Sequence, residues 1–202
     1  MIRIQSLKDR EMAISGKSTN SINRIYQIKI ALRESKPPIW RRLLVSDSIS
    51  LHKLHQIIQI AMGWTDSHLH QFIIHGEYYS IPSPEDWRPV IDERRHLLNK
   101  IAPSENDKFI YEYDFGDGWE HEVLVEKISL PDPDVIYPIC IKGKRACPPE
   151  DVGGIWGYEK FLEAMGDLNH EEHDLFLNWW NGKFDPESFD LEDRNFALRQ
   201  LK

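Results

Sequence analysis

The sequence lacks any run of about 18 apolar residues, which is the length that a membrane-spanning helix needs. Its first ten residues also lack the apolar core of a signal peptide. Only two cysteines are present, Cys140 and Cys147, which is too few for a disulfide framework or for an all-cysteine zinc site. We therefore expect a cytoplasmic protein with no membrane partner, whose fold depends on a hydrophobic core.

Several catalytic signatures are missing as well. The chain contains no Gly-x-Ser-x-Gly nucleophile elbow, no glycine pattern of a dinucleotide-binding domain, and no phosphate-binding loop ending in Lys-Ser or Lys-Thr. From these patterns we expect no cofactor. Whether the chain is an enzyme stays open at this point.

The charge of the chain is acidic and unevenly distributed. The net charge is −8, yet residues 1–36 contain eight Lys or Arg and only three acids, so the rest of the chain carries −13. An acidic body repels phosphate backbones and gains little from counterion release. Bulk nucleic-acid binding is therefore not expected.

Two parts of the chain differ in character. Residues 1–22 are polar, mixed in charge and without periodicity, which predicts a flexible N-terminal segment. Residues 23–202 contain no low-complexity bridge, which predicts a single domain. Alternating segments come first and helical segments fill the last third, so this domain is predicted to be α+β with a mostly antiparallel sheet.

The first half of the domain predicts a hairpin followed by a helix. Residues 25–32 and 39–45 read as two strands, and apolar residues at helical spacing follow from Leu51. Ser50 is a good N-cap for this helix and Gly63 a good C-cap. This order resembles the start of a β-grasp fold.

Later segments predict a second hairpin and the C-terminal helices. Alternating residues flank Asp117-Gly118, a strong hairpin signal. The excursion 82–107, rich in proline and charge, predicts an irregular segment. Asn169 and Asp190 predict helix N-caps.

The second hairpin carries the candidate catalytic residues Asp114, Asp117 and His121. Two carboxylates and an imidazole near one turn can hold a divalent cation or perform acid–base chemistry. The alternative is that both aspartates only build the turn, because Asp tolerates left-handed backbone angles. On that reading His121 is a half-buried strand residue.

His68 and His70 are two apart on a predicted strand, so they share one face. With Asp117 and His121 they are the candidate ligands of a divalent metal, although ordinary strand histidines explain the pair equally well. His52 and His55 lie three apart on the predicted helix and read as surface residues.

A rigid loop is predicted at 146–154, because Pro148-Pro149 stiffens it and Gly153-Gly154 lets the backbone turn sharply. It would present Glu150 and Asp151 for binding, or use them only as caps of a following helix. The candidate binding residues, including aromatic and arginine side chains elsewhere, are Trp40, Arg41, Tyr113, Trp119, Glu150, Asp151 and Trp156. Trp40-Arg41 alternatively forms a charged edge strand.

Five ordered segments carry a family resemblance: Pro37–Arg42, Gly63-Trp64, His68–Phe72, Tyr113–His121 and Ala146–Gly154. Together they resemble the plasmid pRiA4b ORF-3-like family over about residues 24–190. The resemblance implies a prokaryotic, mobile-element-associated protein and marks these segments as a site without assigning a reaction. Some members bear a resolvase name, yet this chain lacks a serine nucleophile in an arginine-rich framework.

Two functions are compatible with these residues. The first is a binding module whose aromatic and acidic groove, lined by Trp40, Trp119 and Trp156, holds a peptide, a nucleotide or a nucleic-acid end. The second is a metal-assisted hydrolase that uses the His/Asp cluster and a divalent cation. The sequence favours the first, because turn and core roles account for most of the acidic and histidine residues.

Overall fold

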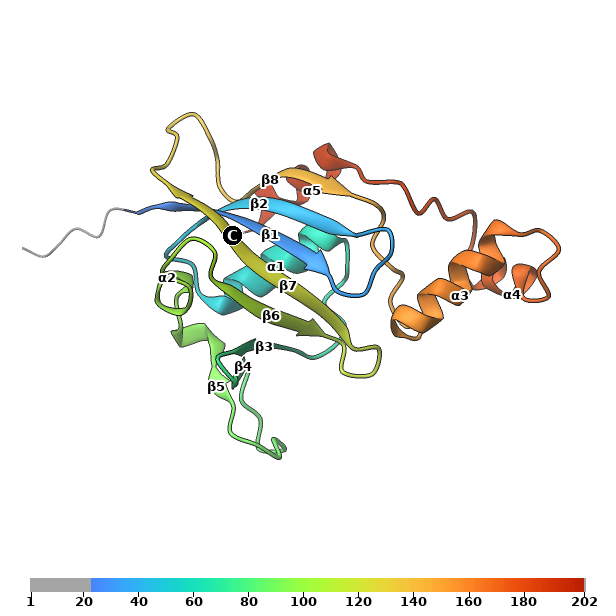
Figure 1. The fold of residues 1–202 in the computed structure, drawn as a ribbon, viewed down its shortest axis with the longest axis horizontal. Helices are drawn as coiled ribbons and strands as arrows, with labels where there is room; N and C mark the ends of the chain where they lie inside the picture. The colour runs from blue at the N-terminus through green and yellow to red at the C-terminus, as the bar shows by residue number, and fades with distance from the viewer. Residues whose placement is uncertain (1–22, 202) are drawn as a thin grey trace, which may run out of the picture.

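The computed structural model describes residues 23–201 of the chain. These residues form one eight-stranded sheet with several helices, so the predicted α+β class is confirmed (Figure 1). The predicted flexible segment 1–22 lies outside the described residues. Within residues 23–201, no helix has the length and apolar character needed to cross a bilayer.

The sheet is antiparallel except at one edge. Its spatial order is β5-β4-β3-β6-β7-β1-β2-β8, and only β4 and β5 run parallel. The strands are β1 (Ile25–Leu32), β2 (Trp40–Ser46), β3 (His70–Ile74), β4 (Glu77–Ser80), β5 (Ile91–Asp92), β6 (Lys108–Tyr113), β7 (Trp119–Ser129) and β8 (Ile139–Lys144).

Both predicted hairpins are present. β1 pairs with β2, and β6 pairs with β7 across the predicted turn, with Tyr113 opposite Trp119. Alternation puts Phe109, Tyr111 and Tyr113 on one buried face of β6, toward helix α1 (Leu51–Met62). The long central strands β1 and β7 join the two hairpins into a single sheet.

Helix α1 lies across one face of the sheet (Figure 1). Its ends are those that the sequence predicts: the Ser50 hydroxyl accepts a hydrogen bond from the Lys53 amide, and Gly63 adopts a left-handed conformation with φ 110°. Leu51, Leu54 and Ile58 are fully buried against the sheet. This contact makes α1 and the sheet the two layers of the core.

The remaining helices are η2 (Glu93–Arg95), α2 (Leu98–Ile101), α3 (Gly154–Gly166), α4 (His173–Trp180) and α5 (Leu191–Gln200). Asp190 caps α5 as predicted, because its carboxylate accepts from the Asp193 amide at 2.9 Å. The prediction for Asn169 is wrong. Helix α4 begins only at His173 without a side-chain cap, because residues 167–172 form turns of their own.

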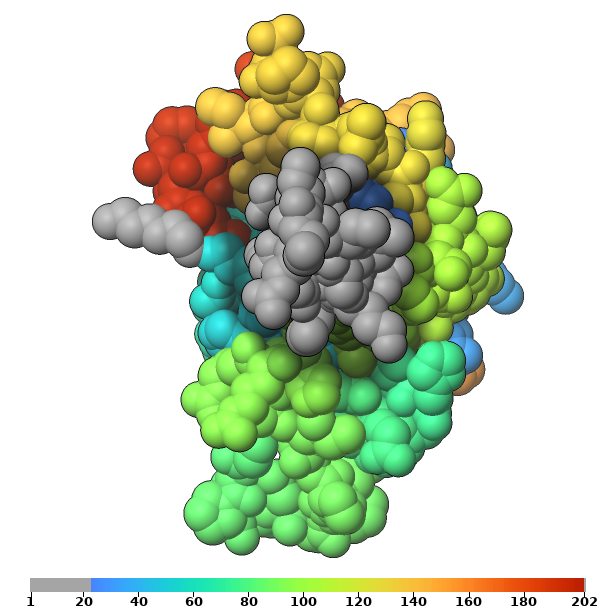
Figure 2. Space-filling view, turned by 90° about the vertical axis from the view of Figure 1, so that its left-hand side faces the viewer, coloured from blue at the N-terminus to red at the C-terminus, as the bar shows by residue number. Residues whose placement is uncertain are grey.

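The excursion between β4 and β5 projects from the body, as Figures 1 and 2 both show. It carries Trp87, whose side chain is among the most exposed of the large apolar residues at 85%. Beyond it the chain returns to the sheet through η2, which brings Glu93 into the interior. The predicted irregular segment thus contains both a projecting tip and a buried carboxylate.

Candidate functional site

Three loops that are distant in sequence are joined beside the turn between β6 and β7. The Asp114 amide donates to the Leu69 carbonyl oxygen at 2.8 Å, which links the turn to the segment that precedes β3. The Gly153 amide donates to a carboxylate oxygen of Asp117 at 3.1 Å, which links the turn to the loop before α3. Three of the five segments that carry the family resemblance therefore meet here.

Gly154 allows this close contact between backbones. A Cβ atom at this position would lie 2.4 Å from the Asp117 carbonyl oxygen, and the residue has φ +70°. A side chain would be both strained and in collision. The sequence predicted a sharp turn at Gly153-Gly154, and the structure gives the reason for the glycine at 154.

The side chain of Tyr113 connects two of these loops through hydrogen bonds. Its hydroxyl donates to Glu150 at 2.5 Å and accepts from the Ser67 amide at 2.9 Å. Glu150 also accepts a hydrogen bond from the Thr65 hydroxyl. Burial, and next the neighbouring Glu150 carboxylate, raise the pKa of Tyr113, so the phenol stays protonated and able to donate.

His68 lies between two carboxylates. Its Nδ1 is 3.6 Å from Asp114, and its Nε2 is 3.3 Å from the exposed Asp151. Asp114 also accepts from the Gly116 amide at 2.9 Å, so it builds the turn as the alternative interpretation proposed. Each ring nitrogen of His68 therefore faces a different carboxylate, and one ligand atom from each of His68, Asp114 and Asp151 lies within 4.8 Å of the others.

A small pocket is lined in part by Leu69 and Phe115, which directly follow His68 and Asp114 in the chain. The pocket has a volume of about 100 Å³, and its lining residues are Leu69, Ser80, Ile81, Ser83, Asp86, Trp87, Arg88, Val90 and Phe115. Leu69 and Trp87 are largely exposed, at 71% and 85%. His68 and Asp114, and two of the residues that line the pocket, therefore belong to the same two segments of the chain.

His121 and Trp119 belong to the core and not to this surface. Both side chains are fully buried, and the edge of the Trp64 ring meets the His121 ring at 5.2 Å between centroids. Burial lowers the pKa of His121 to about 4, so the imidazole is neutral at pH 7. The structure does not bring His121 together with Asp114 and Asp117, because the strand turns its ring toward α1.

Arg41 is buried as well, and its guanidinium donates to carbonyl oxygens of Ala61 at 2.8 Å and Lys144 at 3.1 Å. It thus satisfies the C-terminal end of α1 instead of facing a ligand. Trp40 packs beside the cations of Lys29 and Arg42. A groove shared by Trp40, Trp119 and Trp156 is not formed, since Trp119 is enclosed while Trp156 is 82% exposed.

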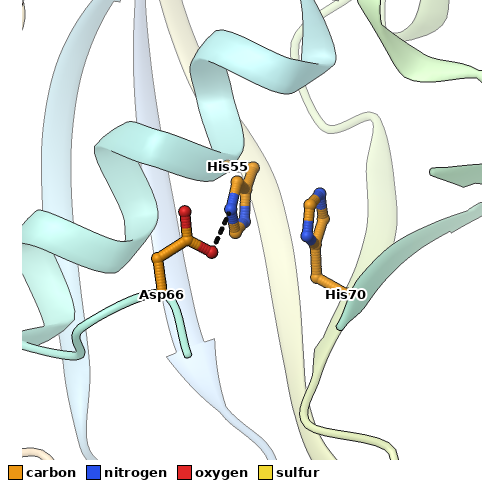
Figure 3. A group of neighbouring side chains, drawn as sticks. All are labelled: His55, Asp66 and His70. Atoms are coloured by element: carbon orange, nitrogen blue, oxygen red, sulfur yellow. Dashed lines mark hydrogen bonds and ion pairs between the residues drawn. The ribbon is translucent and has the colours of Figure 1, made fainter. Parts of the chain in front are cut away.

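A second polar cluster lies beneath α1, and sequence reasoning found only one of its members, His70. The imidazoles of His55 and His70 stack with centroids 3.4 Å apart and planes 3° from parallel. Asp66 lies 2.9 Å from His55 (Figure 3). Glu93, with an exposed fraction of 0%, lies 2.9 Å from His70. His55 was read as surface, although it falls among the apolar residues of the helix.

Burial shifts several pKa values in this cluster, and it raises that of Asp66. Burial is the main reason why the pKa of His55 is lowered to about 3, and the neighbouring His70 adds to it. Burial alone would raise the pKa of Glu93, but hydrogen bonds with His70 and His52 outweigh it and lower that pKa. Glu93 is therefore a buried carboxylate that holds two imidazoles.

Comparisons with known proteins agree with the motif pattern. The family model described as plasmid pRiA4b ORF-3-like protein matches residues 24–193. The uncharacterized protein y4hQ of Sinorhizobium fredii (strain NBRC 101917 / NGR234) is 37% identical over 179 residues, covering 88% of this chain and 92% of that protein.

A solved structure is similar as well. The crystal structure of a protein of unknown function, MM3350 from Methanosarcina mazei Go1, superimposes with a TM-score of 0.79 at 38% identity. The match covers 86% of this chain and 98% of that one. The family model covers residues 24–193, which is most of the chain. The chain therefore belongs to the plasmid pRiA4b ORF-3-like family.

Proposed function

We propose that the protein is a binding module for a short peptide segment that combines a cationic group with an apolar side chain. The observation that carries this proposal is that the same two segments supply the His68 group and line the pocket, since Leu69 follows His68 and Phe115 follows Asp114. The pocket is open and modest in size, which suits one aliphatic or aromatic side chain better than a whole cofactor.

Charge decides among the candidate ligands. Asp114, Glu150 and Asp151 supply three carboxylates near His68, and the pocket lining adds Asp86 and one cation, Arg88, so the acids outnumber the cations even when His68 is counted as charged. A phosphate group would be repelled there, whereas a Lys, an Arg or a peptide amino terminus would be attracted. Of a peptide, a nucleotide and a nucleic-acid end, the peptide is therefore favoured.

Rigidity supports the same conclusion. The loops are tied by backbone contacts and by the hydrogen bonds of Tyr113, so little ordering is needed when a ligand binds. A site that is already ordered loses less entropy on association. Exposed Trp87 supplies a large apolar contact that such sites commonly use as an anchor.

The test is selection from a phage library of random dodecapeptides, followed by fluorescence anisotropy of the enriched peptides. We expect enriched sequences to place Lys or Arg within a few residues of Leu, Phe or Trp. We expect Trp87→Ser and Asp151→Asn each to weaken binding at least about tenfold, which corresponds to about 1.4 kcal/mol. Leu175→Ser, at an apolar position of α4 that is 63% exposed, is the control and should leave binding unchanged.

Two outcomes would overturn the proposal. One is a selected pool without a cationic preference, or with binding that survives both site variants. The other is competition by ATP or by an oligo-dT strand at concentrations where a neutral peptide has no effect, which would mean that the surface prefers phosphate.

A further inference from the structure

The cluster beneath α1 brings together side chains that can bind a cation. His55 comes from α1, Asp66 from the loop after it, and His70 from β3; the two imidazoles lie face to face and Asp66 points toward His55 (Figure 3). One ring nitrogen from each histidine and one oxygen of Asp66 lie within 4.8 Å of one another. Three different elements thus contribute to one small volume.

Each imidazole has a partner on its far side. His55 Nδ1 is 2.8 Å from the Tyr111 hydroxyl, and His70 Nε2 is 2.9 Å from Glu93. Histidines that bind metals almost always use the second ring nitrogen in this way, with a carboxylate or another oxygen as partner. Because an ionised Glu93 only accepts hydrogen bonds, it fixes the proton of His70 on Nε2 and leaves a lone pair on Nδ1.

The partners are themselves held in place. Glu93 is fully buried and also contacts His52 Nδ1 at 2.8 Å, and the Tyr111 hydroxyl also accepts from the Gln59 amide at 2.9 Å. The Tyr111 oxygen has two lone pairs, so it can accept from Gln59 and from His55 together. This supporting arrangement exceeds what packing of two core histidines requires.

We propose that His55, Asp66 and His70 bind one divalent transition-metal ion. Two imidazoles and one carboxylate are ligands that Zn²⁺, Fe²⁺ and Co²⁺ accept, and they leave coordination positions for water or a further ligand. Mg²⁺ and Ca²⁺ prefer oxygen ligands and should bind poorly. Asp66, whose side chain is 52% exposed, is the route by which the ion reaches the two buried rings.

The stacked rings imply a specific movement on binding. A metal ion lies close to the plane of each imidazole that binds it, and two planes only 3° apart cannot both contain the same ion. One ring must therefore turn away from the parallel arrangement.

The experiment uses protein purified without a His-tag and treated with a chelator. Titration with Zn²⁺ is followed by calorimetry, titration with Co²⁺ by visible absorption, and bound metal is counted by elemental analysis. We expect one equivalent of Zn²⁺ or Co²⁺, no saturable binding of Mg²⁺, and a Co²⁺ spectrum typical of mixed nitrogen and oxygen ligands.

Variants identify the ligands. Asp66→Asn alters an exposed side chain, so it should fold normally and weaken Zn²⁺ binding more than tenfold. His70→Gln should also weaken Zn²⁺ binding more than tenfold. Tyr111→Phe should weaken it by about tenfold or more, because His55 loses the partner that orients its ring. His68→Gln is the matched control, since His68 belongs to the other His/Asp group, and it should bind Zn²⁺ as the parent does.

Clear results contradict the proposal. These are the absence of stoichiometric Zn²⁺ and Co²⁺ binding, or an Asp66→Asn variant with unchanged affinity and spectrum. Loss of binding in His68→Gln but not in Asp66→Asn would assign the metal to the other cluster and equally reject this one. The inference is independent of the peptide-binding proposal, whose probes contain no metal.

Discussion

The buried neutral histidine at position 121 makes the stability of the fold depend on pH. Its Nδ1 is 3.3 Å from the Tyr111 carbonyl oxygen, and its Nε2 has no polar partner within residues 23–201. Protonation would create a charge with one hydrogen bond in an apolar interior, which is why burial lowers the pKa of His121 to about 4.

The sign and size of the effect follow from linkage. An unfolded histidine has a pKa near 6.5, so as the pH falls the unfolded chain takes up the proton first and is stabilised relative to the folded one. The stability that comes from keeping His121 neutral is therefore fully present above about pH 6.5, and it is lost as the pH falls from there to about 4. Between pH 7 and pH 5 this amounts to about 2 kcal/mol of unfolding free energy.

The assay compares urea unfolding of the parent and of His121→Phe at both pH values. Phe keeps an aromatic edge near Trp64 but cannot be protonated, so the variant should lose about 2 kcal/mol less than the parent between pH 7 and pH 5. His55, whose pKa is also lowered, contributes equally to both proteins and cancels. Equal losses in parent and variant would refute the reasoning. So would an NMR titration of the parent in which the His121 ring titrates near pH 6.5.

Two further substitutions test the loops and the core by urea unfolding. Gly154→Ala should destabilise the fold by about 2 kcal/mol or more, because the side chain would be strained and would collide with the Asp117 carbonyl. Gly166→Ala, which has open space around it, should be close to neutral. Equal effects of the two substitutions would contradict the argument. Arg41→Met should cost about 3 kcal/mol, because buried carbonyl oxygens lose their donor, and the exposed Arg95→Met should change stability by less than about 0.5 kcal/mol.

The fold was largely predictable because its signals are local. The alternation of β6 and β7, the Asp-Gly turn between them, and the caps at Ser50, Gly63 and Asp190 each depend on a few neighbouring residues. Such preferences act over one turn or one strand, so a sequence pattern contains them. Asn169 was the exception, because the turns of residues 167–172 delay the start of α4.

The site was predictable only in part because it depends on contacts between distant segments. His68, Asp114, Glu150 and Asp151 were named from their motifs, yet nothing local distinguishes them from His121, whose ring points into the core. The pattern did contain one overlooked signal. His55 lies one turn after Leu51, on the face of α1 that packs against the sheet, and was therefore due to be buried.

Glu93 had no such signal, because it stands in an irregular excursion where no periodicity predicts burial. Only the return of this segment to the edge of the sheet brings its carboxylate to His52 and His70, which are 41 and 23 residues away in sequence. A buried carboxylate without partners would be costly, so its position makes sense only with the two histidines already in place.

One short loop connects the two proposed sites. Asp66, the exposed ligand of the proposed metal centre, lies between Thr65, which donates to Glu150, and Ser67, whose amide donates to the Tyr113 hydroxyl. An ion that fixes Asp66 therefore restricts the same backbone that positions Glu150 at the peptide surface. Because such coupling is reciprocal, an ion that strengthens peptide binding is itself bound more tightly, by the same factor, when the peptide is present.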